Sequence, residues 1–589
     1  MRLLRILPLC IAALVKTIMF AETCKAQSAQ FGNHPKYEVR AVWLTTLGGL
    51  DWPKNKAVNT SSSEKQKQEL TLVLDKLKAA GINTVLFQTR IRATVIYPSA
   101  IEPWDACLTG MSKQSPGYDP LAFAIDECHK RGMEIQAWIV VMPVGKWNSA
   151  GCIALRRKHP KLVTKNGDEG YIDPARPEAA TYIASICKEI ANRYDIDGIH
   201  LDYIRYPETW PDRKKNIQKQ KRRKHRINGL TSVKNGTDNA ELKLQQDNIT
   251  AIVRAVHDGI KQIKPWVKLS CATIGKSSDL ARFSSKGWNA LSKGCQDTQK
   301  WINANLVDQL YPMMYFRGNN FYPFVFDWKE NSHGLTIVPG TGIYFLSQQE
   351  GNWPAEEIKR QLNVARGAGM GFAFFRERFL RDDTKGIYNY TKNIFAPYPA
   401  LIPSMGKSDT AKASAPKNLN VRPYGGYDIL SWDSEPTAGA TTFNVYASTR
   451  WPVDTADARN IIAARALSTR IALKPGNRKL YYAVTGVNRY GTESTPTQQP
   501  KTDTKPRTSH LIYNDGLHLT LADTNKKPYN GYILIKDIAE REVNVMPCVG
   551  GQTDISGVAE GFYSIYTLNS KGTAHRIGFT EIRRNNIWH

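Results

Sequence analysis

The feature that most constrains the fold is an alternation of apolar, strand-like segments with amphipathic, helix-like segments between about residues 36 and 396. The strand-like segments are apolar throughout, as expected for parallel strands that are buried on both faces. Eight of them follow one another, at residues 39–44, 84–88, 134–141, 198–203, 268–273, 306–315, 336–344 and 371–375. This α/β pattern predicts a closed (β/α)8 barrel of the TIM type rather than an open, doubly wound sheet.

Helices are predicted between the strands, most clearly at residues 63–80, 121–132, 177–194 and 242–264. In the first of these, Leu70, Leu74 and Leu77 recur at helical spacing and form one apolar face. Ser63 is the expected N-cap, because its hydroxyl can accept a hydrogen bond from a free backbone N–H. Gly81 is expected to end the helix.

An insertion at residues 208–241 separates the fourth strand from its helix, and its centre at 213–226 is dense in Lys and Arg. Loops after barrel strands lie on the catalytic face, so this one is either a solvated loop or a flap that binds polyanions. The whole chain carries a formal net charge of +27. Such a charge suits anionic partners in general. No zinc-finger or other nucleic-acid-binding signature accompanies it, so nucleic acid is not an expected partner.

The first 26 residues resemble an export signal. Arg2 and Arg5 precede an apolar run at residues 7–20, and Cys24-Lys25-Ala26 offers a cleavage site with small residues. We therefore expect export to the periplasm or the outer cell surface, with no transmembrane helix after cleavage. Seven scattered Cys would remain, without CxxC spacing, so neither a disulfide framework nor a structural zinc site is predicted. No organic cofactor is implied, and no oligomeric state is indicated.

The chain beyond the barrel contains a predicted linker at 397–414 and two small β domains. Short alternating strands at 415–505, with Trp432 early and Tyr482 late, resemble a fibronectin type III sandwich. Residues 509–589 are expected to form a second β-sandwich-like module, whose turn around residues 553–563 resembles that of C-terminal sorting modules. Neither segment contains an evident catalytic constellation.

Asp202 is the foremost candidate for catalysis, because it ends the apolar strand at 198–203. A carboxylate there is costly unless it faces a polar site or is hydrogen-bonded. The alternative is a structural aspartate that pairs with Arg205 or Arg90. Asp197 and Asp308 begin strands instead, so they are expected at the opposite, stabilising end of the barrel.

Glycoside hydrolysis needs two carboxyl groups across the scissile bond. Glu377 follows the eighth strand and is one candidate for the second group, although flanking Arg376 and Arg378 fit a plain ion pair equally well. Glu102, in the loop after the second strand, is the other. Side chains expected to orient the site or contact sugar come from the same strand ends and loops: Arg90, Trp104, Trp138, Tyr203, Arg205, Tyr315 and Tyr344.

Several sequence blocks occur in a characteristic order between residues 36 and 396. They are residues 38–44 with Asp51-Trp52-Pro53, residues 83–88 with Tyr97-Pro98-Ser99, Tyr118-Asp119-Pro120-Leu121, Asp173-Pro174-Ala175-Arg176-Pro177, and residues 194–203. Together they resemble glycosyl-hydrolase-like family 10. The resemblance implies a (β/α)8 barrel that acts on bacterial glycans, with peptidoglycan strands as the leading expectation. The family's Gly-Asp-Ala is replaced here by Ala93-Thr94-Val95, which removes an acidic group from the loop after the second strand.

The sequence thus predicts an exported glycoside hydrolase that acts on a cell-envelope polysaccharide, anionic ones included, by acid/base catalysis with two carboxylates. The alternative is a glycan-binding or scaffold protein without catalysis, because a barrel fold does not guarantee chemistry.

Overall fold

The computed structural model describes residues 34–208, 210, 234–405, 413–424, 427–435, 440–475, 479–501, 510–523, 525–538, 540–569 and 572–583. The chain divides into two compact units at Met405 and Gly406, each of which is described by itself. The predicted export signal and the basic segment 213–226 lie outside the described residues. Within the described part, no helix is both long and apolar enough to cross a membrane.

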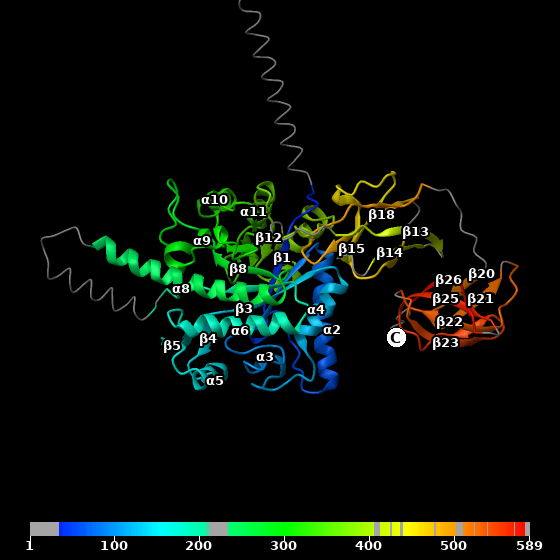
Figure 1. Ribbon diagram of the computed structural model, residues 1–589, viewed down its shortest axis with the longest axis horizontal. Coiled ribbons are helices and arrows are strands. Elements are labelled where there is room, and N and C mark those ends of the chain that lie inside the picture. The colour runs from blue at the N-terminus through cyan, green and yellow to red at the C-terminus, as the bar shows by residue number, and fades with distance from the viewer. Residues whose placement is uncertain are drawn as a thin grey trace, which may run out of the picture. The chain divides into compact units, whose positions relative to one another are not determined.

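The first unit is a closed barrel of parallel strands, as predicted (Figure 1). Each strand pairs with the next around the ring, and the last pairs with the first, Arg40 lying opposite Phe372. The strands in order around the barrel are β1 (Arg40–Leu44), β2 (Thr84–Arg90), β3 (Glu134–Val140), β7 (Gly198–Asp202), β8 (Lys268–Ile274), β9 (Gln309–Met313), the pair β10 (Thr336–Ile337) and β11 (Gly340–Thr341), and β12 (Phe372–Phe374).

Helices cover the outside of the barrel and bury their apolar faces against the strands; α6 and α8 lie side by side in Figure 1. The helices of this unit, those in loops and insertions included, are α2 (Thr60–Ala79), α3 (Ala106–Thr109), α4 (Pro120–Lys130), α5 (Ala150–Lys158), α6 (Pro177–Arg193), α8 (Lys234–Ile263), α9 (Thr298–Asn303), α10 (Tyr322–Glu330), α11 (Ala355–Gly367), α12 (Glu377–Arg381) and α13 (Ile387–Tyr390). The strands are therefore enclosed on both faces, which explains why they are apolar throughout.

Three local predictions were wrong. Helix α2 begins at Thr60 and is capped by Asn59, not by Ser63, because Asn59 and Ser62 form a reciprocal capping box. Helix α8 begins at Lys234 rather than at residue 242. The seventh barrel position is two short strands, β10 and β11, instead of one continuous strand over 336–344; Pro339, which lacks a backbone N–H, lies between them.

The segment after β3 contains a small sheet that the sequence did not predict. Strands β4 (Pro143–Lys146), β5 (Val163–Asn166) and β6 (Glu169–Ile172) form an antiparallel sheet in the order β4-β6-β5, with α5 between β4 and β5. Hereafter this segment is called the β3 insertion. Strands β5 and β6 are short and half-exposed, so they lack the continuous apolar runs of the barrel strands.

Polar side chains inside the barrel form a continuous hydrogen-bonded chain. The Trp43 indole N–H donates to His200 Nε2 at 3.1 Å, and His200 Nδ1 lies 2.7 Å from the Ser270 hydroxyl. Ser270 donates to Gln136, whose amide donates to Gln309. Complete burial lowers the pKa of His200 to about 3, so this histidine is neutral and acts as part of the core.

The second unit consists of antiparallel sheets at the places where strands were predicted. The first two sheets are β13 (Lys417–Tyr424), β14 (Tyr427–Asp433) and β17 (Arg470–Leu473), and then β16 (Ile461–Ala466), β15 (Ala440–Ser448), β18 (Tyr481–Asn488) and β19 (Thr497–Gln498). Their shared core includes Trp432 and Phe443, with ring centroids 5.3 Å apart.

Two further sheets follow in the C-terminal segment. They are β20 (His510–Asn514), β21 (His518–Asp523) and β24 (Gln552–Asp554), and then β23 (Glu542–Cys548), β22 (Gly531–Lys536), β25 (Gly561–Leu568) and β26 (Ala574–Ile582). Ile555 and Val558, in the turn singled out from the sequence, are buried in the core between these sheets. The seven described cysteines of the chain are all buried and free of disulfides.

Candidate active site

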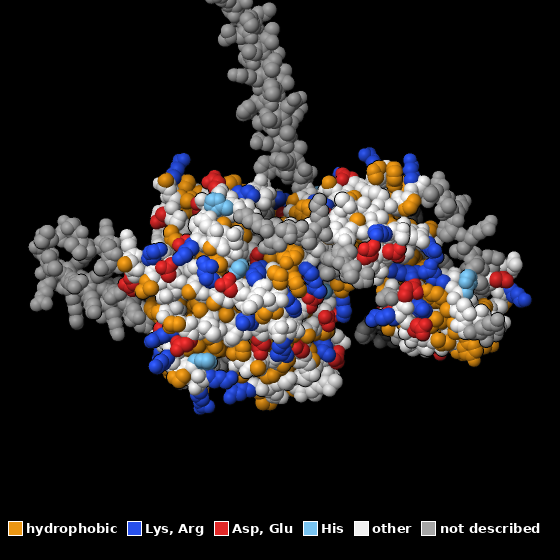
Figure 2. Space-filling view, in the orientation of Figure 1, with side chains coloured by type: hydrophobic (Ala, Val, Ile, Leu, Met, Phe, Trp, Pro, Cys, Tyr) orange, Lys and Arg blue, Asp and Glu red, His pale blue; other side chains and the backbone are white. Residues whose placement is uncertain are grey.

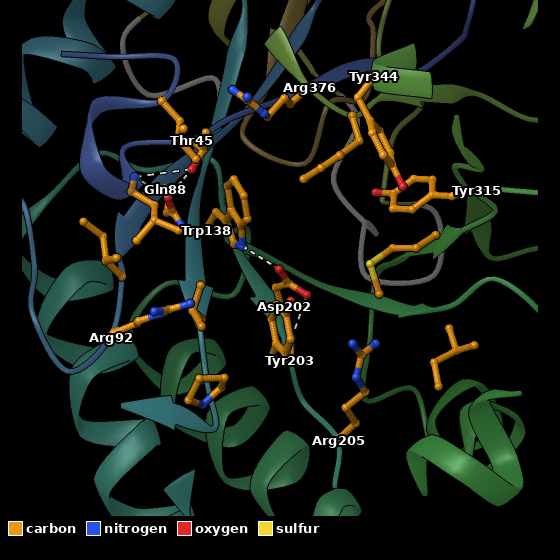
Figure 3. Close-up of a pocket in the computed structure, with 18 of the residues that line it drawn as sticks. Thr45, Gln88, Arg92, Trp138, Asp202, Tyr203, Arg205, Tyr315, Tyr344 and Arg376 are labelled. Carbon is orange, nitrogen blue, oxygen red and sulfur yellow. Dashed lines mark hydrogen bonds between the residues drawn. The ribbon is translucent and has the colours of Figure 1, made fainter. Parts of the chain in front are cut away.

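A pocket of about 540 Å³ opens at the carboxyl ends of the barrel strands, a size in the range of small-ligand sites. Every strand position contributes to its wall, either directly or through the loop that follows it (Figure 3). Aromatic side chains dominate this wall: Trp138, Tyr171, Tyr203, Trp288, Tyr315, Phe316, Tyr344 and Phe375. Such a lining offers flat apolar faces with polar edges.

Asp202 is the buried carboxyl group of this pocket. It is the last residue of β7 and is 5 % exposed. The Trp138 indole N–H donates to Oδ2 at 3.1 Å, and the backbone N–H of Tyr203 donates to Oδ1 at 2.7 Å. Burial raises the pKa of Asp202, while the charge of Arg205 and these two donors act in the opposite direction. The strand end therefore positions an acid that holds its proton more tightly than an exposed aspartate.

Two aromatic hydroxyl groups border Asp202. Tyr203 adopts a positive φ of 51°, which is uncommon outside glycine, and its side chain is 43 % exposed. The Asp202 charge is the main cause that raises the pKa of Tyr203. The Tyr315 hydroxyl is buried and has no hydrogen-bond partner among the described residues. An unpartnered buried hydroxyl is costly, so Tyr315 is available to hydrogen-bond a bound molecule.

A second carboxylate lines the pocket, and it comes from the β3 insertion. Glu169 begins β6, which also contributes Tyr171 to the wall. The Tyr171 hydroxyl donates to Glu169 Oε2 at 3.1 Å, and Arg92 Nη1 lies 3.7 Å from Oε1. Among the described residues that line the pocket, Asp202 and Glu169 are the two acids. Glu169 was not among the residues predicted from the sequence, because no sequence pattern indicated a strand pair near the site at residues 163–172.

Glu102 and Arg90 lie outside the pocket and bind each other. Arg90 donates to both carboxylate oxygens of Glu102 at 2.7–3.0 Å, and the Tyr182 hydroxyl donates to the same carboxylate at 2.6 Å. Arg90 also donates to the backbone carbonyl of Val141. Both side chains are almost fully buried. This pair fixes the loop after β2 to the barrel and leaves neither group free for a substrate.

Glu377 is also buried behind the pocket wall. It lies in the first turn of α12, with Oε1 at 2.9 Å from Arg381 Nε, yet neither oxygen forms a hydrogen bond of good geometry. Burial raises the pKa of Glu377 to about 8. The neighbouring Arg376 does line the pocket and forms an ion pair with the buried Asp51. Arg378 is half-exposed and lies near Asp382 instead.

The remaining predicted contact residues divide into two groups. Trp138, Tyr203, Arg205, Tyr315 and Tyr344 all line the pocket with Asp202. Trp104 packs against the hydrophobic core and does not line the pocket.

The substitution at Thr94 also falls outside the pocket. The Thr94 hydroxyl donates to Asp105 at 2.6 Å, and Ala93 adopts a positive φ of 57° at the position of the family's glycine. The pocket therefore keeps both of its acids despite this departure.

No group of three or more His, Cys, Asp or Glu side chains in the described residues could hold a metal ion. On the face of the barrel seen in Figure 2, Lys and Arg side chains are scattered among acidic ones rather than gathered in a strip. The chemistry of this site is thus that of two carboxyl groups, hydroxyl donors and guanidinium groups within an aromatic wall.

Comparisons with known proteins agree with this arrangement. Residues 38–342 match the family model described as glycosyl hydrolase-like 10. "Glycosyl hydrolase YngK" of Bacillus subtilis (strain 168) is 29 % identical over 433 residues, covering 69 % of this chain and 82 % of that protein. "Glycosyl hydrolase DigH" of Escherichia coli (strain K12) is 32 % identical over 377 residues, covering 58 % and 83 %.

Among solved structures, the glycoside hydrolase domain of PgaB (BpsB) from Bordetella bronchiseptica aligns with 60 % of this chain and 98 % of that domain. Its sequence identity is 13 % and its TM-score 0.40. The family model covers just over half of the chain and most of the barrel that forms the pocket. The chain therefore belongs to the glycosyl hydrolase-like 10 family.

Proposed function

We propose that this protein is an exported glycoside hydrolase that cleaves the glycan strands of the bacterial cell envelope, with peptidoglycan strands as the favoured substrate. One observation carries the proposal: Asp202 is a buried acid with a raised pKa at the carboxyl end of a barrel strand, inside an aromatic pocket. Catalytic groups of barrel enzymes occupy this position. A carboxyl group that holds its proton more tightly than an exposed one is suited to protonate a leaving glycosidic oxygen.

Glu169 is the proposed second carboxylate, in place of Glu377 and Glu102. It lines the same pocket, whereas Glu377 and Glu102 do not. Its charge and that of Asp202 both raise the pKa of the Tyr203 hydroxyl. In the proposed reaction, Asp202 gives its proton to the leaving oxygen while Glu169 attacks the anomeric carbon or activates water. The separation of the two groups during turnover decides between these routes.

The substrate and the location rest on separate support. Aromatic faces in the pocket suit sugar rings, and the curated relatives bear the name glycosyl hydrolase. The family resemblance favours peptidoglycan. Export is supported by the basic and apolar residues of the N-terminal 26 positions.

The test compares the parent protein with Asp202→Asn and Glu169→Gln on peptidoglycan glycan strands from which the peptides have been removed. New reducing ends are measured over time. We expect each substitution to lower the rate by about 10²–10⁴-fold. Asp126→Asn, an exposed position on α4, is the matched control and should retain the parent rate.

A glycan-binding role without hydrolysis is the second candidate, and one observation favours it. Arg92 and Tyr171 already contact Glu169, which leaves Asp202 as the pocket acid without an ion-pair partner in the described residues. If the parent protein released no reducing ends but bound the strands, and Asp202→Asn bound them equally well, this second function would replace the first.

A further inference from the structure

Arg205 differs from the other arginines at this end of the barrel, because its guanidinium group has no hydrogen-bond or ion-pair partner among the described residues. Arg90 is bound to Glu102, Arg376 is paired with Asp51, and Arg92 lies near Glu169. Arg205 lines the pocket and is only partly exposed. None of the described residues accepts a hydrogen bond from its guanidinium group or forms an ion pair with it.

The Arg205 side chain is nevertheless held in place. Its guanidinium carbon lies 4.8 Å from the centre of the Tyr203 ring, a cation–π contact that fixes the side chain beside the pocket. Tyr203 follows Asp202 directly and has a positive φ of 51°. Figure 3 shows the guanidinium group of Arg205 extending toward the part of the pocket where Asp202 and Tyr315 lie, with Arg92 on the other side of Asp202.

Asp202 is not the ion-pair partner of Arg205, because the two side chains are not within ion-pair distance. The Arg205 charge lowers the pKa of Asp202, but burial raises it by more. The planar fork of N–H donors thus lines the pocket with no acceptor among the described residues. Such a fork matches the two oxygens of a carboxylate, and two parallel hydrogen bonds of this kind are stronger than neutral ones.

We propose that Arg205 binds a carboxylate carried by the substrate, so that the pocket selects glycans with a carboxyl group on a sugar unit next to the cleaved bond. This inference rests on the proposed function, because it assigns the substrate class of the same pocket. It makes Arg205 a specificity-determining residue whose effect depends on one chemical group of the glycan. Neutral glycans would leave the guanidinium group desolvated without compensation.

The test uses peptide-free peptidoglycan glycan strands in two forms, one native and one with its carboxyl groups converted to methylamides. The full-length parent, Arg205→Gln, Arg205→Lys and the control Arg157→Gln, an exposed position at the end of α5, are compared. Two quantities are measured on both polymers, namely kcat/KM for release of reducing ends and binding affinity. Circular dichroism and thermal unfolding establish that each variant is folded.

We expect amidation to lower kcat/KM of the parent by about 10- to 100-fold. Arg205→Gln should show the same loss on native strands and little further loss on amidated strands. Arg205→Lys should be intermediate, since it keeps the charge but not the fork, and Arg157→Gln should behave as the parent. A purely structural role of Arg205 would instead lower activity equally on both polymers.

The outcomes separate this inference from the proposed function. Cleavage that is indifferent to amidation overturns the inference and leaves hydrolysis standing. Binding that requires both the carboxyl groups and Arg205, without cleavage, overturns hydrolysis and supports the inference. Strands that are neither bound nor cleaved overturn both.

Discussion

Both ends of the barrel contain ion pairs, but the carboxyl end combines pairs such as Arg90–Glu102 and Arg376–Asp51 with pocket-lining groups that form no ion pair among the described residues. At the amino ends of the strands, buried charges are paired: Glu38 binds Arg40 and Arg366, and Lys268 binds Glu134. Asp308 forms a partly buried pair with Lys261, and Asp197 Oδ2 lies 2.8 Å from His129 Nε2. At the carboxyl ends, Asp202, Arg205 and the Tyr315 hydroxyl lie close to one another without an ion pair or hydrogen bond among them.

This difference indicates that the amino end stabilises the barrel and that the carboxyl end binds a ligand. A buried charge without compensation is expensive, so a barrel selected for stability alone would pair the groups at both ends. Groups that stay unsatisfied next to a pocket are the ones that a bound molecule can satisfy. Substitutions should therefore lower stability at the paired end and leave or raise it at the pocket end.

The largest effect is expected from Lys268→Met, which removes one member of a buried pair. Glu134 would remain buried without its cation, and we expect a loss of about 3–5 kcal/mol in the free energy of unfolding. Urea denaturation of the barrel, followed by tryptophan fluorescence, measures it. The double variant Glu134→Gln/Lys268→Met should recover most of the loss. If Lys268→Met lost less than about 1 kcal/mol in the free energy of unfolding, the pair would not stabilise the amino end as proposed.

The next effect concerns Glu377, whose pKa is raised from 4.5 to about 8 by burial. A raised pKa means that the folded state holds the proton more tightly, so this group favours folding most below pH 4.5. The contribution is lost as the pH rises toward 8. At about 1.4 kcal/mol per pH unit, reduced by the cost of placing an amide in a buried site shaped for a carboxyl group, Glu377→Gln should gain about 2–4 kcal/mol over the parent above pH 8.

Unfolding measured at pH 5 and pH 8.5 tests this expectation. The exposed Glu330→Gln is the control and should show no such gain. An equal difference between Glu377→Gln and the parent at both pH values would mean that Glu377 does not titrate in this range.

A smaller effect is expected from two tyrosines that lie within or just after β9. The Tyr311 hydroxyl donates to Gln309 at 3.0 Å, whereas no described residue forms a hydrogen bond with the Tyr315 hydroxyl. Tyr311→Phe should lose about 1 kcal/mol of stability, and Tyr315→Phe should gain about as much while it lowers hydrolytic activity. Thermal unfolding measures both. Equal losses for the two variants would show that Tyr315 is satisfied in the folded protein.

The smallest effect on stability is expected for Asp202→Asn. Removal of a buried charge favours folding, but the new amide group would face the N–H of either Trp138 or Tyr203. The two contributions oppose each other, and we expect a net change within about 1 kcal/mol. Urea denaturation at neutral pH tests it. A loss of about 3 kcal/mol or more in the free energy of unfolding would mean that Asp202 has a structural role, like the paired charges at the amino end.

The barrel could be predicted because each of its strands is a continuous apolar run in the sequence. The segment at 198–203, for instance, became β7 with only its last residue outside the strand. Asp202 could be found for the same reason, since a carboxylate at the end of such a run stands out. Local boundaries failed where a short-range interaction decided them, as the Asn59 capping box did at the start of α2.

The second carboxylate could not be found in this way. Glu169 lies in a four-residue strand whose neighbours are half-exposed, so its sequence resembles that of an ordinary surface turn. Glu102 and Glu377 were more conspicuous in sequence because they follow barrel strands directly. Arg90 and Arg381 lie near them in sequence, but burial also depends on distant segments, such as Tyr182 against Glu102, which a single sequence does not display.

The β3 insertion allows the two pocket acids to change position independently during evolution. Glu169 is carried by a separable sheet between β3 and α6, whereas Asp202 belongs to the barrel itself. If the two act together as proposed, exchange of a single contiguous segment would move one carboxylate relative to the other. The stereochemical course of glycosidic cleavage follows that separation. Related proteins could then switch between retention and inversion by exchange of the β3 insertion alone, without any change in the barrel strands.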